Sequence, residues 1–128
     1  MNFKSILFAL TTLVTLSLAI VLNPQITSPS ADTKWRAGDT RTVTWDTENV
    51  TGGPIPEGMK GTIKLGYLDP KDGPNEHLNW DLGSGFDLNK GSFVVTLPSE
   101  LETKRTYIIV LMGDSGNASP QFTITAAR

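Results

Sequence analysis

The sequence predicts an all-β domain, an antiparallel β-sandwich of about seven short strands. Apolar and polar residues alternate with a period of two between turn signals, and residues 20–128 contain no convincing helical stripe. Turn-forming residues are frequent, with 12 Gly and 8 Pro in 128 residues. A chain of this length is typical of a single domain.

The first two strands are predicted near the start of the sandwich. Residues 25–28 form a short strand that ends at Pro29, because proline cannot donate to a strand ladder. Residues 41–47 alternate strictly, with Val43 and Trp45 on one face and polar side chains on the other. We therefore expect the side chains of Val43 and Trp45 in the core.

Five more strands follow, separated by turn residues: 62–67, 76–82, 92–97, 107–112 and 121–125. The segment 76–82 has the weakest pattern, with Leu78, Trp80 and Leu82 in register. The segment 107–112 is apolar on both faces, which favours a central strand covered on both sides.

A tyrosine corner is predicted ahead of the central strand. Leu101 and Tyr107 are six positions apart, as in the corner where a tyrosine hydroxyl bonds to upstream backbone in many sandwiches. The chain has Thr103 and Arg105 between them, in place of the proline and threonine often found there. The pattern still favours a bond from Tyr107 to the preceding backbone.

The N-terminal segment has the features of a secretory signal peptide, predicted at residues 1–19. Lys4 precedes an uncharged apolar stretch, and Ser17 and Ala19 supply the small residues before a cleavage site. Residues 6–22 fall short of the roughly 20 apolar residues of a membrane span and contain several Thr and Ser. We expect cleavage after Ala19, which leaves residues 20–128 as one secreted β-sandwich domain without membrane attachment.

Composition narrows the classes of partner and modification. The net charge is −2 with no Lys/Arg cluster, which argues against nucleic-acid binding. The absence of Cys excludes disulfides and thiolate chemistry. Two N-glycosylation sequons, beginning at Asn49 and Asn117, suit a secreted protein, and Pro120 directly after the second disfavours its use.

Three N-terminal segments and one C-terminal segment resemble a known family: Ile26-Thr27-Ser28-Pro29, Trp35-Arg36-Ala37-Gly38, Thr42-Val43-Thr44-Trp45-Asp46-Thr47 and Ser119-Pro120-Gln121-Phe122-Thr123-Ile124. The chain resembles, over about residues 24–125, the N-terminal domain of the yeast cell-wall β-1,6-glucan synthesis proteins. That domain also occurs in Ser/Thr-rich GPI-anchored surface proteins. The resemblance implies an immunoglobulin-like or fibronectin-like sandwich at the fungal cell wall or surface, and it supplies no catalytic residues. This chain has no Ser/Thr-rich stalk or anchor signal, so covalent attachment to the wall is not expected.

Catalytic and metal chemistry find little support. His77 is the only histidine, and no Gly-x-Ser-x-Gly elbow surrounds any serine, which argues against a Ser-His-Asp triad. One imidazole without thiolates is too few for zinc or copper, so no metal or cofactor is expected. We interpret His77 as a solvated loop side chain. For Asp69, Asp72 and Glu76 three roles are open: ordinary turn residues, a Ca²⁺ loop or part of a glycosidase pair. Lys71 and the short loops favour the first role.

The leading hypothesis is a non-enzymatic secreted domain of the fungal cell wall or extracellular space that binds β-glucan. Its candidate binding residues are Trp35, Trp80, Asp69, Asp72 and Glu76, although packing in the core is the simpler role for each tryptophan. The second hypothesis is a protein-interaction or effector module that pairs through edge strands with a surface protein or a second copy. A polysaccharide-active enzyme is the least favoured alternative.

Overall fold

The structure is a computed structural model that describes residues 22–113 and 116–128. The predicted signal peptide, residues 1–19, lies outside the described residues. Within the part that the structure describes, no helix is long and apolar enough to cross a membrane.

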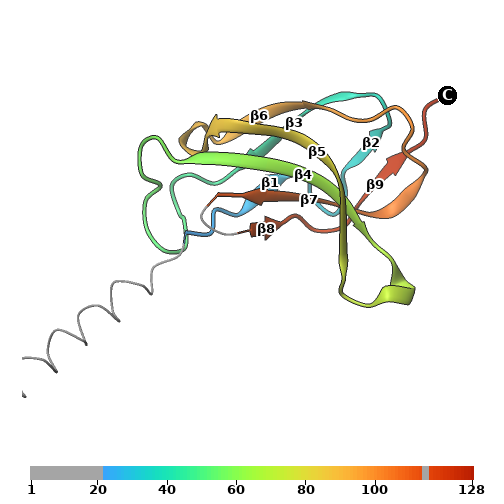
Figure 1. The fold of residues 1–128 in the computed structure, drawn as a ribbon, viewed down its shortest axis with the longest axis horizontal. Helices are drawn as coiled ribbons and strands as arrows, with labels where there is room; N and C mark the ends of the chain where they lie inside the picture. The colour runs from blue at the N-terminus through green and yellow to red at the C-terminus, as the bar shows by residue number, and fades with distance from the viewer. Residues whose placement is uncertain (1–21, 114–115) are drawn as a thin grey trace, which may run out of the picture.

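The fold consists of two β-sheets packed as a sandwich (Figure 1). The smaller sheet has the order β1-β3-β6, formed by β1 (Ile26–Ser28), β3 (Thr40–Trp45) and β6 (Ser92–Thr96). The larger sheet has the order β2-β9-β7-β4-β5, formed by β2 (Lys34–Arg36), β9 (Phe122–Thr125), β7 (Lys104–Met112), β4 (Lys60–Leu68) and β5 (Glu76–Asp87). Strand β8 (Gly116–Ala118) also pairs with β7, and two short 3₁₀ turns are present, η1 (Pro70–Asp72) and η2 (Leu88–Lys90). The all-β sandwich is confirmed.

Each predicted strand is present, with β5 extending five residues beyond the predicted end at Leu82 to Asp87. Strands β2 and β8 were not predicted, because each has only three residues and shows no alternation of its own. The expectation of a purely antiparallel sandwich needs one correction. Strand β2 pairs in parallel with β9, so that Trp35 lies opposite Ile124.

The core lies between the sheets and is built from the alternating positions. Val43 and Trp45 are buried on the inner face of β3, as their spacing predicts. The indole Nε1 of Trp45 donates a hydrogen bond of 2.8 Å to the carbonyl of Leu88, which satisfies its polar group inside the core. Tyr107 to Leu111 are all buried, so the central strand β7 is covered on both faces as expected.

The tyrosine corner is confirmed. The Tyr107 hydroxyl donates a 2.6 Å hydrogen bond to the backbone carbonyl of Glu102, and Leu101 is buried beside it. Burial of the ring raises the pKa of Tyr107, and the nearby Glu102 carboxylate raises it further. The phenol therefore stays protonated at neutral pH and keeps its role as a donor.

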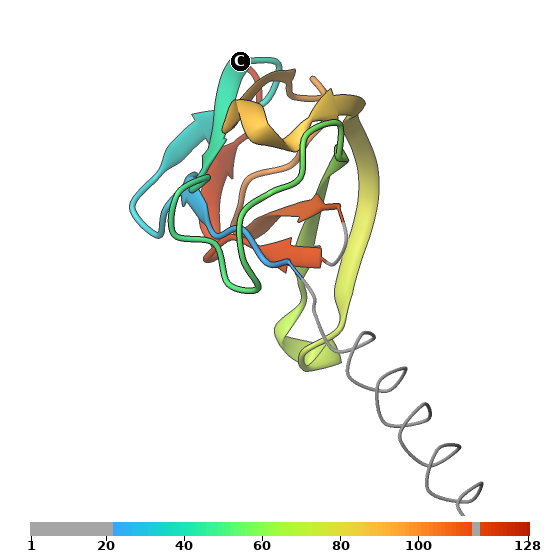
Figure 2. The same ribbon diagram turned by 90° about the vertical axis from the view of Figure 1, so that its left-hand side faces the viewer.

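The hairpin of β4 and β5 extends beyond the sandwich and ends at the η1 turn (Figures 1 and 2). Asp69 begins that turn, and its Oδ1 accepts a 3.0 Å hydrogen bond from the Lys71 N–H. The two strands approach closely at Gly66, where a Cβ would lie 2.5 Å from the His77 carbonyl oxygen. The absence of a Cβ at Gly66 thus allows β4 and β5 to approach each other closely next to the aromatic residues of the hairpin.

Candidate functional site

An aromatic cleft lies where the β4–β5 hairpin meets the tyrosine corner. Its volume is about 250 Å³. Its walls combine aromatic and polar side chains: Tyr67, Trp80, Tyr107, Asn79, Glu100, Glu102 and Lys104. We call it the Trp80 cleft. Ligand sites commonly combine aromatic walls with a few polar groups that fix orientation.

Trp80 provides the aromatic wall on β5, the edge strand of the larger sheet. Its ring is half-buried, with centroids 6.4 Å from Tyr67 and 6.3 Å from Tyr107, in tilted arrangements. These contacts pack the indole against two tyrosine rings while part of it stays exposed. The exposed part of the ring is available for stacking on a ligand.

Tyr67 is held by partners that leave it little freedom. The His77 ring stacks on it with centroids 4.9 Å apart and planes 19° apart. The Lys104 Nζ lies 5.0 Å from the Tyr67 ring centroid, in a cation–π contact, and also 3.3 Å from Glu102 Oε2. Tyr67 thus acts as a support for the cleft, and Lys104 joins that support to the Glu102 carboxylate.

The interpretation of His77 as a solvated loop residue is wrong. His77 lies in β5, its side chain is 33% exposed, and its ring is stacked on Tyr67. Its Nε2 is inaccessible to solvent and lies 2.8 Å from Asp72 Oδ2, without the alignment of a regular hydrogen bond. This contact joins the η1 turn to the strand that carries Trp80.

A second cavity of about 310 Å³ adjoins the Trp80 cleft on the hairpin side. Its lining includes Asp69, Pro70 and Thr106, and it shares Tyr67 and Lys104 with the cleft. We call it the hairpin cavity. The two hollows therefore lie on either side of one shared pair of side chains.

The sequence-predicted binding residues have different positions. Trp80 lines the cleft and Asp69 lines the hairpin cavity, whereas Asp72 contacts His77 and the exposed Glu76 lines neither hollow. Trp35 is only 7% exposed. It packs edge-on against Phe122, with ring centroids 5.1 Å apart, so burial removes Trp35 from the candidate site.

Sequence reasoning missed the polar wall formed by Glu100, Glu102 and Lys104. These residues precede and begin β7, about 20 positions after Trp80 in the chain. The only sequence signal was the tyrosine corner, which placed this segment against the core without indicating that Trp80 lies opposite.

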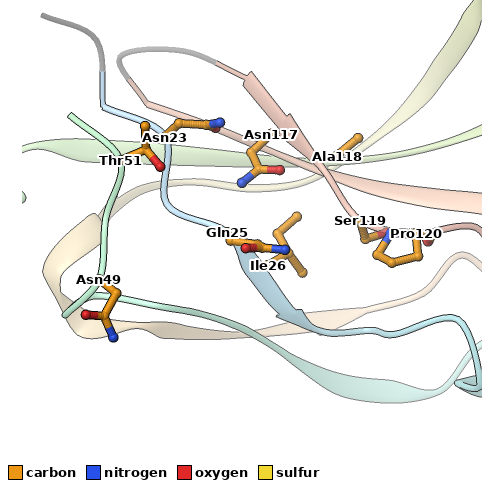
Figure 3. Close-up of a pocket in the computed structure, with 9 residues that line it drawn as sticks. All are labelled: Asn23, Gln25, Ile26, Asn49, Thr51, Asn117, Ala118, Ser119 and Pro120. Atoms are coloured by element: carbon orange, nitrogen blue, oxygen red, sulfur yellow. Dashed lines mark hydrogen bonds between the residues drawn. The ribbon is translucent and has the colours of Figure 1, made fainter.

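Two further observations complete the survey of predicted sites. Among residues 22–113 and 116–128, no group of three or more His, Asp or Glu side chains is arranged to hold a metal ion. The sequon asparagines Asn49 and Asn117 both line a separate cavity between β1 and β8 (Figure 3).

Comparison with known proteins gives one match. A family model described as "Kre9/KNH-like N-terminal Ig-like domain" matches residues 28–124. The matched range includes all the residues named above that line the Trp80 cleft. No curated protein and no solved structure matches the chain.

Proposed function

Because the chain belongs to the family of Kre9/KNH-like N-terminal Ig-like domains, we propose that it is a non-catalytic cell-wall module that binds β-glucan in the Trp80 cleft. The family is linked to cell-wall glucan synthesis, which favours an extracellular role and a wall polymer as ligand. The observation that carries the proposal is the partly exposed Trp80, which lines one cleft together with several polar side chains.

The side-chain chemistry suits a neutral sugar. The C–H face of a pyranose ring packs on an aromatic ring, while its hydroxyls donate to carboxylate and amide oxygens. Glu100 and Glu102 supply carboxylates and Lys104 supplies one positive charge, so these three residues leave the cleft with a net negative charge. A polyanionic polymer would meet repulsion there, whereas an uncharged glucan would not.

The adjoining hollows favour a chain over a single sugar. A ligand that fills both the Trp80 cleft and the hairpin cavity must cross Tyr67 and Lys104, which line both. The contacts of His77 with Tyr67 and Asp72 hold the hairpin in place for this longer contact. We therefore expect affinity to increase from a single glucose to an oligosaccharide of several units.

The carboxylates are poorly arranged for hydrolysis. Glu100 and Glu102 are both exposed, and Glu102 is paired with Lys104. A glycosidase needs one carboxyl group kept protonated by a desolvated environment and a second across the scissile bond. Binding without cleavage is the activity that this arrangement favours.

The test is retention of the secreted protein on insoluble β-1,3-glucan, β-1,6-glucan and chitin, followed by titration with soluble oligosaccharides of increasing length. Trp80→Ala should lower affinity at least about tenfold, equivalent to roughly 1.4 kcal/mol. Trp80→Phe should restore part of the binding. Glu102→Gln should weaken binding, whereas the matched control Glu76→Gln changes an exposed carboxylate outside the cleft and should not.

Two results would overturn the proposal. One is a folded wild-type protein that no polymer retains. The other is retention that Trp80→Ala leaves unchanged while denaturation curves show that the variant is folded.

A protein partner is the second candidate, favoured by one surface observation. Strand β6 is at the edge of the smaller sheet and carries no charged residue. Its Val94 is 59% exposed, the only large apolar side chain so exposed among the described residues. Such edges pair readily with other strands. Light scattering of wild-type protein and Val94→Lys tests this, since a monomer at all concentrations would exclude pairing with a second copy.

A further inference from the structure

The two glycosylation sequons meet in space although they are far apart in the chain. Asn49 and Asn117 line one cavity of about 420 Å³, between the segment that leads into β1 and strand β8 (Figure 3). The two side chains have different contacts at this cavity, and that difference decides which of them has room for a glycan.

The side chains of the second sequon, at Asn117 and Ser119, make hydrogen bonds within the fold. The Asn117 Nδ2 donates a hydrogen bond to the Pro24 carbonyl, and Figure 3 shows its side chain directed toward the chain that enters β1. Ser119 is 6% exposed, and its Oγ accepts a 3.0 Å hydrogen bond from the Ile109 N–H while donating to the Pro120 carbonyl at 2.9 Å. The Asn117 side chain thus joins β8 to the chain that precedes β1, and the Ser119 side chain joins the residue after β8 to β7.

The first sequon leaves its amide free. Asn49 is exposed, and within the described part of the chain its side chain makes no hydrogen bond. Its backbone N–H donates to Asp46 Oδ1 at 3.1 Å, and the Glu48 N–H donates to the same atom at 2.9 Å. These two donors, that of Asn49 first, lower the pKa of Asp46 and fix the turn. Figure 3 shows the Asn49 side chain pointing away from the other labelled residues.

We propose that Asn49 is N-glycosylated and that Asn117 is not. In the transfer, the Asn49 Nδ2 forms a bond to the anomeric carbon of a lipid-pyrophosphate-linked oligosaccharide. The bond from that carbon to the pyrophosphate oxygen breaks, the lipid pyrophosphate leaves, and Nδ2 loses one proton. At Asn117 the same bond would place a sugar on the atom that contacts Pro24, and the chain entering β1 would have to move away from β8.

A glycan on Asn49 leaves the Trp80 cleft open. In Figure 1 the segment between β3 and β4 lies at the left end of the molecule, and the β4–β5 hairpin lies at the lower right. Glycosylation of Asn49 does not depend on glucan binding and is measured separately from it.

The experiment is expression of the full chain through a eukaryotic secretory pathway, followed by glycopeptide mapping of the wild-type protein. Enzymatic removal of N-glycans in H₂¹⁸O marks each formerly modified asparagine by its conversion to ¹⁸O-labelled Asp. We expect the mark at Asn49 alone, a loss of all N-glycan mass in Asn49→Gln, and its retention in Asn117→Gln. The Asn117→Gln variant should also unfold at a lower denaturant concentration, because it misplaces the donor to Pro24. A glycan on Asn117 in the folded secreted protein, or an unmodified Asn49, overturns the proposal. Glycopeptide mapping of the wild-type protein detects either result without any variant.

Discussion

The Tyr107→Phe substitution tests whether the tyrosine corner stabilises the fold. It removes one hydroxyl, which donates a 2.6 Å hydrogen bond to the Glu102 carbonyl, and it keeps a ring that is 1% exposed. An intramolecular hydrogen bond contributes about 0.5–1.5 kcal/mol net to stability. Glu102 is exposed, so water can partly replace the lost donor at its carbonyl. We expect the free energy of unfolding to fall by about 1 kcal/mol, equivalent to a Tm decrease of roughly 4–8 °C.

The assay is urea unfolding at neutral pH, repeated at alkaline pH. The pKa of Tyr107 is raised above its ordinary value of 10.0, so its contribution is complete below about pH 10 and is lost as pH rises through the folded-state pKa. The difference between wild type and Tyr107→Phe should therefore narrow at high pH. Tyr67→Phe is the matched control, because in the described part of the chain the Tyr67 hydroxyl makes no hydrogen bond; it should change stability by less than about 0.5 kcal/mol. Equal losses in the two variants would refute the reasoning.

Two further predictions concern packing and acid stability. Gly83→Ala should destabilise the fold by about 1–3 kcal/mol in a urea titration, because the new Cβ would lie 2.3 Å from the Phe93 ring. Gly116→Ala is the control, because its new Cβ would lie 3.9 Å from the nearest heavy atom, on Val110. Equal effects of the two substitutions would contradict the packing argument. The pKa of Asp46 is lowered from 3.8 by the backbone N–H of Asn49 and that of the preceding residue, so its contribution is present above about pH 4 and is lost as pH falls through the folded-state pKa. Urea midpoints measured from pH 6 to pH 2 should therefore fall less steeply in Asp46→Ala than in wild type, and parallel profiles would contradict the assignment.

Strand positions were predictable wherever one face of a strand is buried and the other is solvated. Val43 and Trp45 on β3 are such a case, since a period of two places both in the core. The three-residue strand β2 offers too little sequence for a periodicity, and its parallel pairing with β9 depends on residues almost 90 positions away. The exposure of Trp35 was unpredictable for the same reason, because Phe122 on β9 is what covers it.

The candidate site was predictable only in part. Trp35 and Trp80 were both candidates because an exposed tryptophan ring suits stacking on a sugar, and the sequence does not distinguish the buried Trp35 from the partly exposed Trp80. Glu102 and Lys104 were missed because they reach the cleft through the pairing of β7 with β4, a contact between distant segments. The role of His77 follows from its stacking on Tyr67 across the β4–β5 register, in which these two residues lie directly opposite.

The parallel pairing of β2 with β9 has a mechanical consequence. Tension at the C-terminal end of the domain pulls β9 toward its C-terminal end, and tension that is transmitted past β1 pulls β2 toward its N-terminal end. In a parallel pair these are opposite directions along the same axis, so the strands are loaded in shear and their hydrogen bonds, such as that from the Ala37 N–H to the Thr125 carbonyl, resist together. A hairpin pulled from its open end separates one bond at a time. The last strand therefore stays in place under such a load until several of these hydrogen bonds break together.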